Sequence, residues 1–136
     1  MSSKKDLNRT YLKIAKTISE LSVAKRKQVG CVVVKDNNIL SFGYNGTPHD
    51  FDNVCEDENN NTKPEVLHAE SNAITKIAKS TLSIENSDMY LTLSPCFECA
   101  KLIIQSGIST VYYAEEYRKR DGLELLEKSN INVVKL

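Results

Sequence analysis

The sequence lacks an excess of charge of either sign and any long apolar run. Eighteen basic residues balance eighteen acidic ones over 136 positions, so no net positive field attracts a nucleic-acid backbone or an anionic membrane. The longest apolar runs cover a few residues, such as 31–34, whereas a bilayer requires roughly 18. We therefore expect no membrane span and no nucleic-acid partner, which favours small-molecule chemistry.

The amino-terminal region also lacks an apolar stretch behind its basic residues. We therefore expect no secretory signal and a cytoplasmic location, in the host cytoplasm for a viral protein. Cysteines are few, and in that compartment they stay reduced. A close pair such as Cys96 and Cys99 is then expected to serve a metal or redox site and not a disulfide.

A chain of this length suits one domain over 1–136, and it contains no repeat, no linker and no low-complexity segment beyond 59–61. Apolar residues at alternating spacings of four and three predict a helix over about 4–23 with one core-facing stripe. The stripe consists of Leu7, Tyr11, Ile14, Ile18 and Leu21.

The rest of the chain alternates between extended and helical segments. Residues 29–34 and 39–44 predict two strands, and 36–38 predict a hairpin turn between them. The polar stretch 46–64 has no period, and a loop of that length is usually functional or disordered. The alternation that follows indicates an α/β sandwich with parallel strand pairs in a mixed sheet. It consists of helices over about 67–79, 96–105 and 119–129 and strands over 88–93, 109–114 and 131–135.

The chemistry resides in a His-x-Glu segment and a Pro-Cys-x-x-Cys segment that contribute His68, Glu70, Cys96 and Cys99. One imidazole and two thiolates suit zinc, and three protein ligands leave a fourth tetrahedral position open for water, as in catalytic sites. Zinc lowers the pKa of water from about 15.7 to about 7. Glu70 is then the expected proton shuttle to the ring nitrogen and the leaving ammonia.

The two cysteines are spaced i, i+3, so a helix places both sulfurs on the same side. Ser94 followed by Pro95 predicts a helix cap and a first-turn proline, which places both thiols in the first turn. The helix dipole favours the thiolate form there. His68 similarly falls near the start of its own helix, so two helix amino termini are expected to converge on the metal.

Each segment alone is a weak signal. A Cys-x-x-Cys at a helix start also occurs in thioredoxin-like redox pairs and in structural zinc sites. A redox pair leaves His68 and Glu70 without a role, and a closed structural site requires a fourth Cys or His nearby. The combination of H-x-E with P-C-x-x-C is the signature of zinc base deaminases.

At these residues the chain resembles the cytidine deaminase superfamily, and specifically the deoxycytidylate deaminases of bacteria, eukaryotes and large phages. The resemblance implies a three-layer sandwich with a mixed five-stranded sheet between helices, and hydrolysis of dCMP to dUMP for thymidylate synthesis. It also implies that zinc is held by His68, Cys96 and Cys99. Ser94 stands where tRNA adenosine deaminases and nucleoside-level cytidine deaminases usually carry an acidic residue. The matching segments are 43–46, 68–74, 89–96, 98–101 and 104–108, with Tyr112, Tyr113 and Tyr117.

The same resemblance implies that Asn45 binds the deoxynucleotide, and Ser94 is included in the predicted substrate site. The substrate phosphate requires cations or backbone amides, which the basic runs 25–27 and 118–120 offer. Arg26 is preferred because it precedes a strand leading toward Asn45 and because bacterial relatives often carry arginine there. Tyr117, just beyond a strand's carboxyl end, is expected to pack against base or sugar, with a core position nearly as well supported.

Three other cysteine and histidine positions require separate interpretations. Some phage relatives carry a second, structural zinc in a longer insertion, but here the segment offers only Cys55 and His49, so we expect one zinc per chain. Cys31 lies in an apolar strand and is expected to be a core residue. His49 is expected on the loop surface.

Three rival functions stay open. The first is a deaminase of the same fold that acts on dCTP, or on both dCMP and dCTP. The second is a polynucleotide base deaminase, which requires a basic surface that the neutral charge balance does not favour. The third is a zinc-stabilised interaction module without catalysis. Glu70 argues against it, because a structural zinc site needs no unliganded carboxylate beside the metal.

The resemblance further implies a hexamer that dCTP activates and dTTP inhibits through a site near Gly43, Tyr44 and Gly46. Because the loop 46–64 is acidic, we expect the triphosphate to arrive with Mg²⁺ or to meet basic residues from elsewhere.

Overall fold

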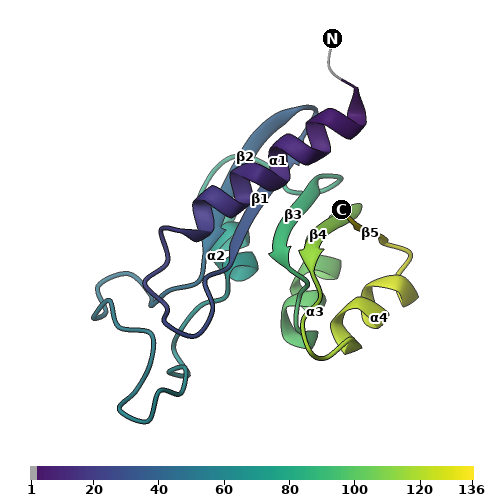
Figure 1. Cartoon of the computed structure of the whole chain (residues 1–136). Coiled ribbons are helices and arrows are strands. Elements are labelled where there is room, and N and C mark those ends of the chain that lie inside the picture. The colour runs from purple at the N-terminus through teal and green to yellow at the C-terminus, as the bar shows by residue number, and fades with distance from the viewer. Residues whose placement is uncertain (1–2) are drawn as a thin grey trace.

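The computed structural model describes residues 3–136 and contains a five-stranded sheet with helices on both faces (Figure 1). The strand order is β2-β1-β3-β4-β5; β1 runs antiparallel to both β2 and β3, whereas β3, β4 and β5 are parallel. The elements in chain order are α1 (Lys4–Ser19), β1 (Gly30–Lys35), β2 (Asn38–Tyr44), α2 (Ala69–Ala78), β3 (Asp88–Leu93), α3 (Phe97–Ser106), β4 (Thr110–Glu115), α4 (Asp121–Lys128) and β5 (Asn132–Lys135).

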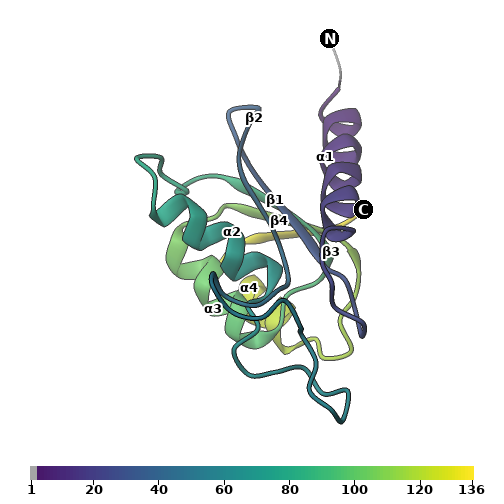
Figure 2. The same cartoon turned by 90° about the vertical axis from the view of Figure 1, so that its left-hand side faces the viewer.

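The helices form two separate layers, with α1 on one face of the sheet and α2, α3 and α4 on the other (Figure 2). On the α1 face, Tyr90 of β3 stacks on Tyr112 of β4 with ring centroids 4.6 Å apart, and its hydroxyl donates to Asn8 of α1 at 2.5 Å. The predicted three-layer α/β/α sandwich with a mixed sheet is therefore confirmed.

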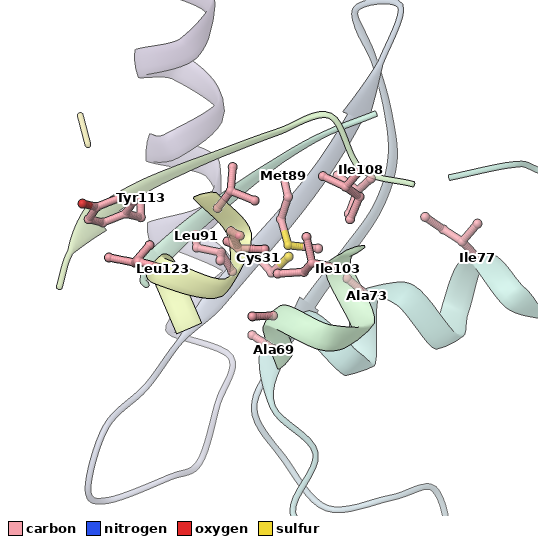
Figure 3. Packing of buried hydrophobic residues seen from close by; sticks show 14 residues of the cluster. Cys31, Ala69, Ala73, Ile77, Met89, Leu91, Ile103, Ile108, Tyr113 and Leu123 are labelled. Atoms are coloured by element: carbon pink, nitrogen blue, oxygen red, sulfur yellow. The ribbon is translucent and has the colours of Figure 1, made fainter. Parts of the chain in front are cut away.

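The larger core lies between the sheet and the helices α2, α3 and α4 (Figure 3). Met89 and Leu91 of β3 point into it beside Cys31 of β1, and Ala73 of α2 and Ile103 of α3 close it from the other side. All five are fully buried. The prediction that Cys31 is a core residue is confirmed.

The hairpin between β1 and β2 forms as the sequence predicts. Asp36 and Asn37 both adopt positive φ, 50° and 60°, which is the backbone of a type I′ turn. The twist of such a turn matches the right-handed twist of the flanking strands, and Asp and Asn tolerate this region better than other non-glycine residues.

The first helix ends four residues earlier than the apolar stripe predicts. It stops at Ser19, and Leu21 is 55% exposed instead of buried. The chain leaves the helix there because Ser22 bonds to the segment just after β2, where its hydroxyl donates to the carbonyl oxygen of Asn45 at 2.8 Å. Leu21 fits the period, but a period alone does not show where tertiary contacts end a helix.

Four chain segments meet at one edge of the sheet. The carboxyl ends of the parallel strands β3 and β4 lie there, and because β1 is antiparallel, its amino end lies beside them, with the Gly30 N–H bonded to Thr92 at 3.0 Å. This edge therefore gathers residues 20–29, 45–68, 94–96 and 116–120. Loops at such an edge are where α/β sheets bind ligands. Within residues 3–136 no helix is both long and apolar enough to cross a membrane.

Candidate active site

A His/Cys/Cys group lies at this edge, where two helix amino termini converge. His68 is the N-cap of α2 and Cys96 is the N-cap of α3, while Cys99 lies in the first turn of α3. The Nδ1 atom of His68 is 3.5 Å from the sulfur of Cys96 and 3.3 Å from that of Cys99. All three ligand atoms lie within 4.8 Å of one another, and no other such group occurs in residues 3–136.

The spacing of these atoms fits zinc. A tetrahedral ion with Zn–N near 2.05 Å and Zn–S near 2.3 Å holds its nitrogen and sulfur ligands about 3.6 Å apart. The observed 3.3 and 3.5 Å are close to this value. Both ends of the group are also anchored on helices whose positive dipole ends favour thiolate. The residues present therefore suit a three-ligand zinc site.

The cap of α3 lies two residues later than predicted. The N-cap is Cys96, whose sulfur accepts the Cys99 N–H at 3.5 Å, and neither Ser94 nor Pro95 lies in the helix. Ser94 instead bonds to the end of β4 and to the segment after it: its N–H donates to the Glu115 carbonyl oxygen and its hydroxyl accepts the Tyr117 N–H at 2.7 Å. The local preference of serine for helix caps predicted that Ser94 caps α3, but its hydrogen bonds go to the end of β4 and to Tyr117 instead.

The two thiols have unlike acidities because they lie side by side. A hydrogen bond from the Cys99 side chain, with a second from His68, lowers the pKa of Cys96 to about 4. The pKa of Cys99 is raised, first by this bond to Cys96 and then by burial. The bond to Cys96 also raises the pKa of His68. The hydrogen bond between the two side chains thus favours the thiolate at Cys96 over that at Cys99.

Glu70 lies in the first turn of α2 and is only 4% exposed. Burial raises the pKa of its carboxyl to about 7, against a smaller lowering by a backbone hydrogen bond and by His68. A carboxyl with a pKa near neutrality gains and loses a proton with equal ease at physiological pH, which suits general acid–base chemistry.

A cavity of about 560 Å³ opens beside this group, and its volume lies in the usual range for small-molecule sites. His68, Glu70 and Cys96 line it, whereas Cys99 is buried behind them. Each residue predicted to contact substrate lines it as well. These are Arg26, Asn45, Ser94 and Tyr117.

Asn45 is held at the cavity by its own side-chain amide. Its Nδ2 donates to the Lys27 carbonyl oxygen at 2.8 Å and its Oδ1 accepts the Val29 N–H at 2.9 Å. The amide therefore shapes the segment before β1. It retains one N–H and one lone pair for a ligand.

Three cations of the predicted basic runs line the cavity, namely Arg26, Lys27 and Arg118. The ammonium of Lys27 is paired with Glu115 at 2.7 Å, and the guanidinium of Arg118 lies 5.8 Å from the ring centroid of Tyr117. Arg120 does not line the cavity; it pairs with Glu116, which does. Within residues 3–136, the guanidinium of Arg26 has no carboxylate partner.

In the Gly-Tyr-Asn-Gly segment, residues 43–46, only Asn45 lines this cavity. A Cβ on Gly43 would lie 2.4 Å from the Ala69 carbonyl oxygen, so the close approach that this glycine permits is to α2 and not to a ligand. The Tyr44 carbonyl oxygen accepts the side-chain amide of Asn72 on α2. Gly46 forms an isolated bridge with Leu67, and a Cβ there would meet nothing within 4 Å.

His49 and Cys55 do not come together. The His49 side chain is 96% exposed and lies 3.4 Å from Asp50, whereas Cys55 is buried. The prediction of a surface histidine is confirmed.

Glu56 is a cavity residue that the sequence did not single out. It is buried, and its carboxylate accepts the N–H groups of Lys25 and Arg26. In the sequence it is one acid among five in a polar loop, and nothing local distinguishes it from its exposed neighbours.

The fold and the site place the protein among zinc-dependent hydrolases of the α/β class, in which an open three-ligand metal site adjoins a buried carboxylate. The chain belongs to the cytidine and deoxycytidylate deaminase family, whose zinc-binding region matches residues 5–115. This match includes His68, Glu70, Cys96 and Cys99.

Individual relatives agree with this assignment. A probable deoxycytidylate deaminase of Caenorhabditis elegans is 43% identical over 111 residues, covering 77% of this chain and 55% of the relative. Human deoxycytidylate deaminase is 35% identical over 120 residues, covering 82% and 66%. The dCMP deaminase of the cyanophage S-TIM5, crystallised with dCMP and dUMP, is 45% identical and has a TM-score of 0.96, with 99% and 100% covered. The chain thus spans about half to two thirds of the two cellular relatives and the whole of the phage protein.

Proposed function

We propose that this protein deaminates dCMP, hydrolysing it to dUMP and ammonia and so supplying dUMP for thymidylate synthesis. The observation that carries the proposal is the His68, Cys96 and Cys99 group, which meets buried Glu70 at a cavity of nucleotide-accepting size. The likeness to a phage protein crystallised with dCMP and dUMP supports the choice of nucleotide.

In this proposal His68, Cys96 and Cys99 hold one Zn²⁺. When bound, the ion supplies a Lewis acid that brings the pKa of water near 7 and so makes a nucleophile available at neutral pH. Glu70 takes one proton from the attacking water and delivers it to the ring nitrogen, and it then moves the remaining hydroxyl proton to the amino group, which departs as ammonia. Burial of Glu70 keeps its carboxyl near the acidity that such a shuttle requires.

The remaining cavity residues orient the nucleotide. We assign the substrate phosphate to Arg26, which lines the cavity and whose guanidinium has no carboxylate partner among the described residues, whereas the guanidinium of Arg118 lies beside the ring of Tyr117. Asn45 contacts the sugar through the polar capacity left on its amide. Tyr117 packs against base or sugar. Ser94 holds Tyr117 in place, because the Ser94 hydroxyl accepts the backbone N–H of Tyr117.

We further propose that the protein is a single cytoplasmic domain that assembles into a hexamer, activated by dCTP and inhibited by dTTP. Gly43, Tyr44 and Gly46 lie outside the catalytic cavity, at the base of the long loop, and a second nucleotide there would not compete with dCMP. Mg²⁺ accompanying the triphosphate would offset the acidic side chains of the loop.

An ammonia-release assay across dCMP, CMP, deoxycytidine, dCTP and a short single-stranded DNA tests the proposal. We expect dCMP to exceed deoxycytidine by orders of magnitude in kcat/KM. Equal rates for the two would identify a nucleoside deaminase, and a preference for dCTP or DNA would move the substrate assignment. Elemental analysis should find one zinc per chain, and Cys96→Ala should lose zinc and activity together.

A further inference from the structure

Glu56 joins two parts of the chain that are about thirty residues apart in sequence. Its Oε2 accepts the N–H of Lys25 at 2.9 Å and the N–H of Arg26 at 3.2 Å. Residues 25–26 belong to the irregular segment between α1 and β1, where no strand supplies partners for these donors. A buried carboxylate is costly unless such hydrogen bonds satisfy it, so this contact is specific and not a chance approach.

The same loop also contacts the side chain of Arg26. Glu56 forms an isolated bridge with Thr62, and the hydroxyl of Thr62 lies 3.5 Å from Nη1 of Arg26. Arg26, Glu56 and Thr62 all line the catalytic cavity. The bridge 56–62 thus holds Arg26 by its backbone on one side and its guanidinium on the other.

The carboxylate of Glu56 makes this contact without neutralising the cation. Its recorded bonds go to backbone N–H groups and not to the guanidinium. In contrast, the ammonium of the neighbouring Lys27 forms an ion pair with Glu115. The arrangement orients Arg26 while leaving its charge for an anionic ligand.

We infer that Glu56 is a positioning residue for phosphate recognition: it holds the Lys25–Arg26 backbone so that Arg26 faces the substrate phosphate. The inference rests on the proposed function. The inference predicts a selective effect, because loss of the hydrogen bonds from Glu56 to the Lys25–Arg26 backbone weakens only the binding of the group that Arg26 contacts. A substrate without a phosphate does not depend on it.

The test measures kcat and KM of the zinc-loaded full-length protein on dCMP and on deoxycytidine. In Glu56→Ala, KM for dCMP should rise about tenfold, since two part-buried N–H donors lose their acceptor and the arginine is released. The kcat/KM for deoxycytidine should stay within about twofold. Glu56→Gln keeps an acceptor oxygen and should restore most of the affinity for dCMP.

Asp57→Ala is the matched control. Asp57 is also an acid of this loop that accepts two backbone N–H groups, those of Asn59 and Asn61, but both lie within the loop itself. This variant should leave KM for dCMP unchanged. If Glu56→Ala does not fold, Glu56→Asp, which withdraws the carboxylate by one methylene, takes its place.

Combining the substitution with Arg26→Ala completes the test. If Glu56 acts through Arg26, removing Glu56 from the Arg26→Ala protein should add little to KM for dCMP. Independent effects of the two, equal losses on both substrates, or an equal effect of Asp57→Ala would overturn the inference. A zinc-loaded wild type that turns over no dCMP would overturn the proposed function as well, so the two failures are distinguishable.

Discussion

Among single residues, Gly122 places a zinc ligand from a position far along the chain. It lies in the first turn of α4, and a Cβ there would lie 2.2 Å from the Pro95 carbonyl oxygen and 2.8 Å from that of Cys96. Both contacts are to backbone, which does not move aside as a flexible side chain does. The turn that presents Cys96 is therefore seated directly on α4.

Gly122→Ala should weaken zinc binding by about 10- to 100-fold, the range for loss of support around a metal ligand. The methyl group displaces the Pro95–Cys96 backbone and so shifts one sulfur relative to His68. Competition with a chromophoric chelator measures the affinity directly. Gly46→Ala, where the added methyl meets nothing within 4 Å, is the control and should bind zinc normally. Unchanged zinc affinity in the Gly122 variant would show that the turn relaxes without cost.

Glu70→Gln should retain zinc and the fold while losing about 10²–10⁴ in kcat, because the amide fills the same space without carrying the proton. Single-turnover rates with metal content measured on the same sample separate chemistry from zinc loss. Turnover near the wild-type rate in a fully loaded Gln variant would remove Glu70 from the reaction.

At the scale of elements, each helix contributes differently to the site and to stability. The helices α2 and α3 begin at zinc-site residues and continue into the large core, so the same elements carry chemistry at one end and packing along their length. The helix α1 instead covers the opposite face and ends where residues 20–29 turn toward the cavity. Its last predicted core position, Leu21, lies outside the helix.

Two substitutions test this division. Ile103→Ala on α3 should lower the free energy of unfolding by about 2–5 kcal/mol, because the side chain is fully buried and leaves a cavity. Leu21→Ala should cost less than about 0.5 kcal/mol, since that side chain is more than half exposed. Denaturant titration of both variants gives the comparison. A loss of several kcal/mol at Leu21 would mean that the helix packs further than residue 19.

At the scale of the whole molecule, the proposed regulation requires coupled subunits. We expect a sigmoidal dependence of rate on dCMP that dCTP converts to a hyperbola and dTTP suppresses, carried by an oligomer. Steady-state kinetics at subsaturating dCMP, with the oligomer size measured by sedimentation, addresses both parts. A monomer with hyperbolic kinetics indifferent to both triphosphates would refute the regulation and leave the catalytic proposal in place.

The sequence by itself determined the features whose cause is local. The i, i+3 cysteines, the His-x-Glu pair and the alternation of strands and helices follow from residue types at short spacings. Short spacings control helix faces and strand pleats, and these predicted His68, Glu70, Cys96 and Cys99 as one group together with the layers of the fold.

Only the tertiary structure decided the features whose partners are distant in the chain. Ser94 does not cap α3, because it bonds to β4 and to Tyr117 instead. Leu21 does not join the buried face of α1, because the chain turns toward Asn45 after the helix ends. Glu56 reaches Lys25 and Arg26 across a loop whose sequence has no period. Such contacts depend on which edges and loops meet once the sheet has formed, and no short pattern in the chain encodes that meeting.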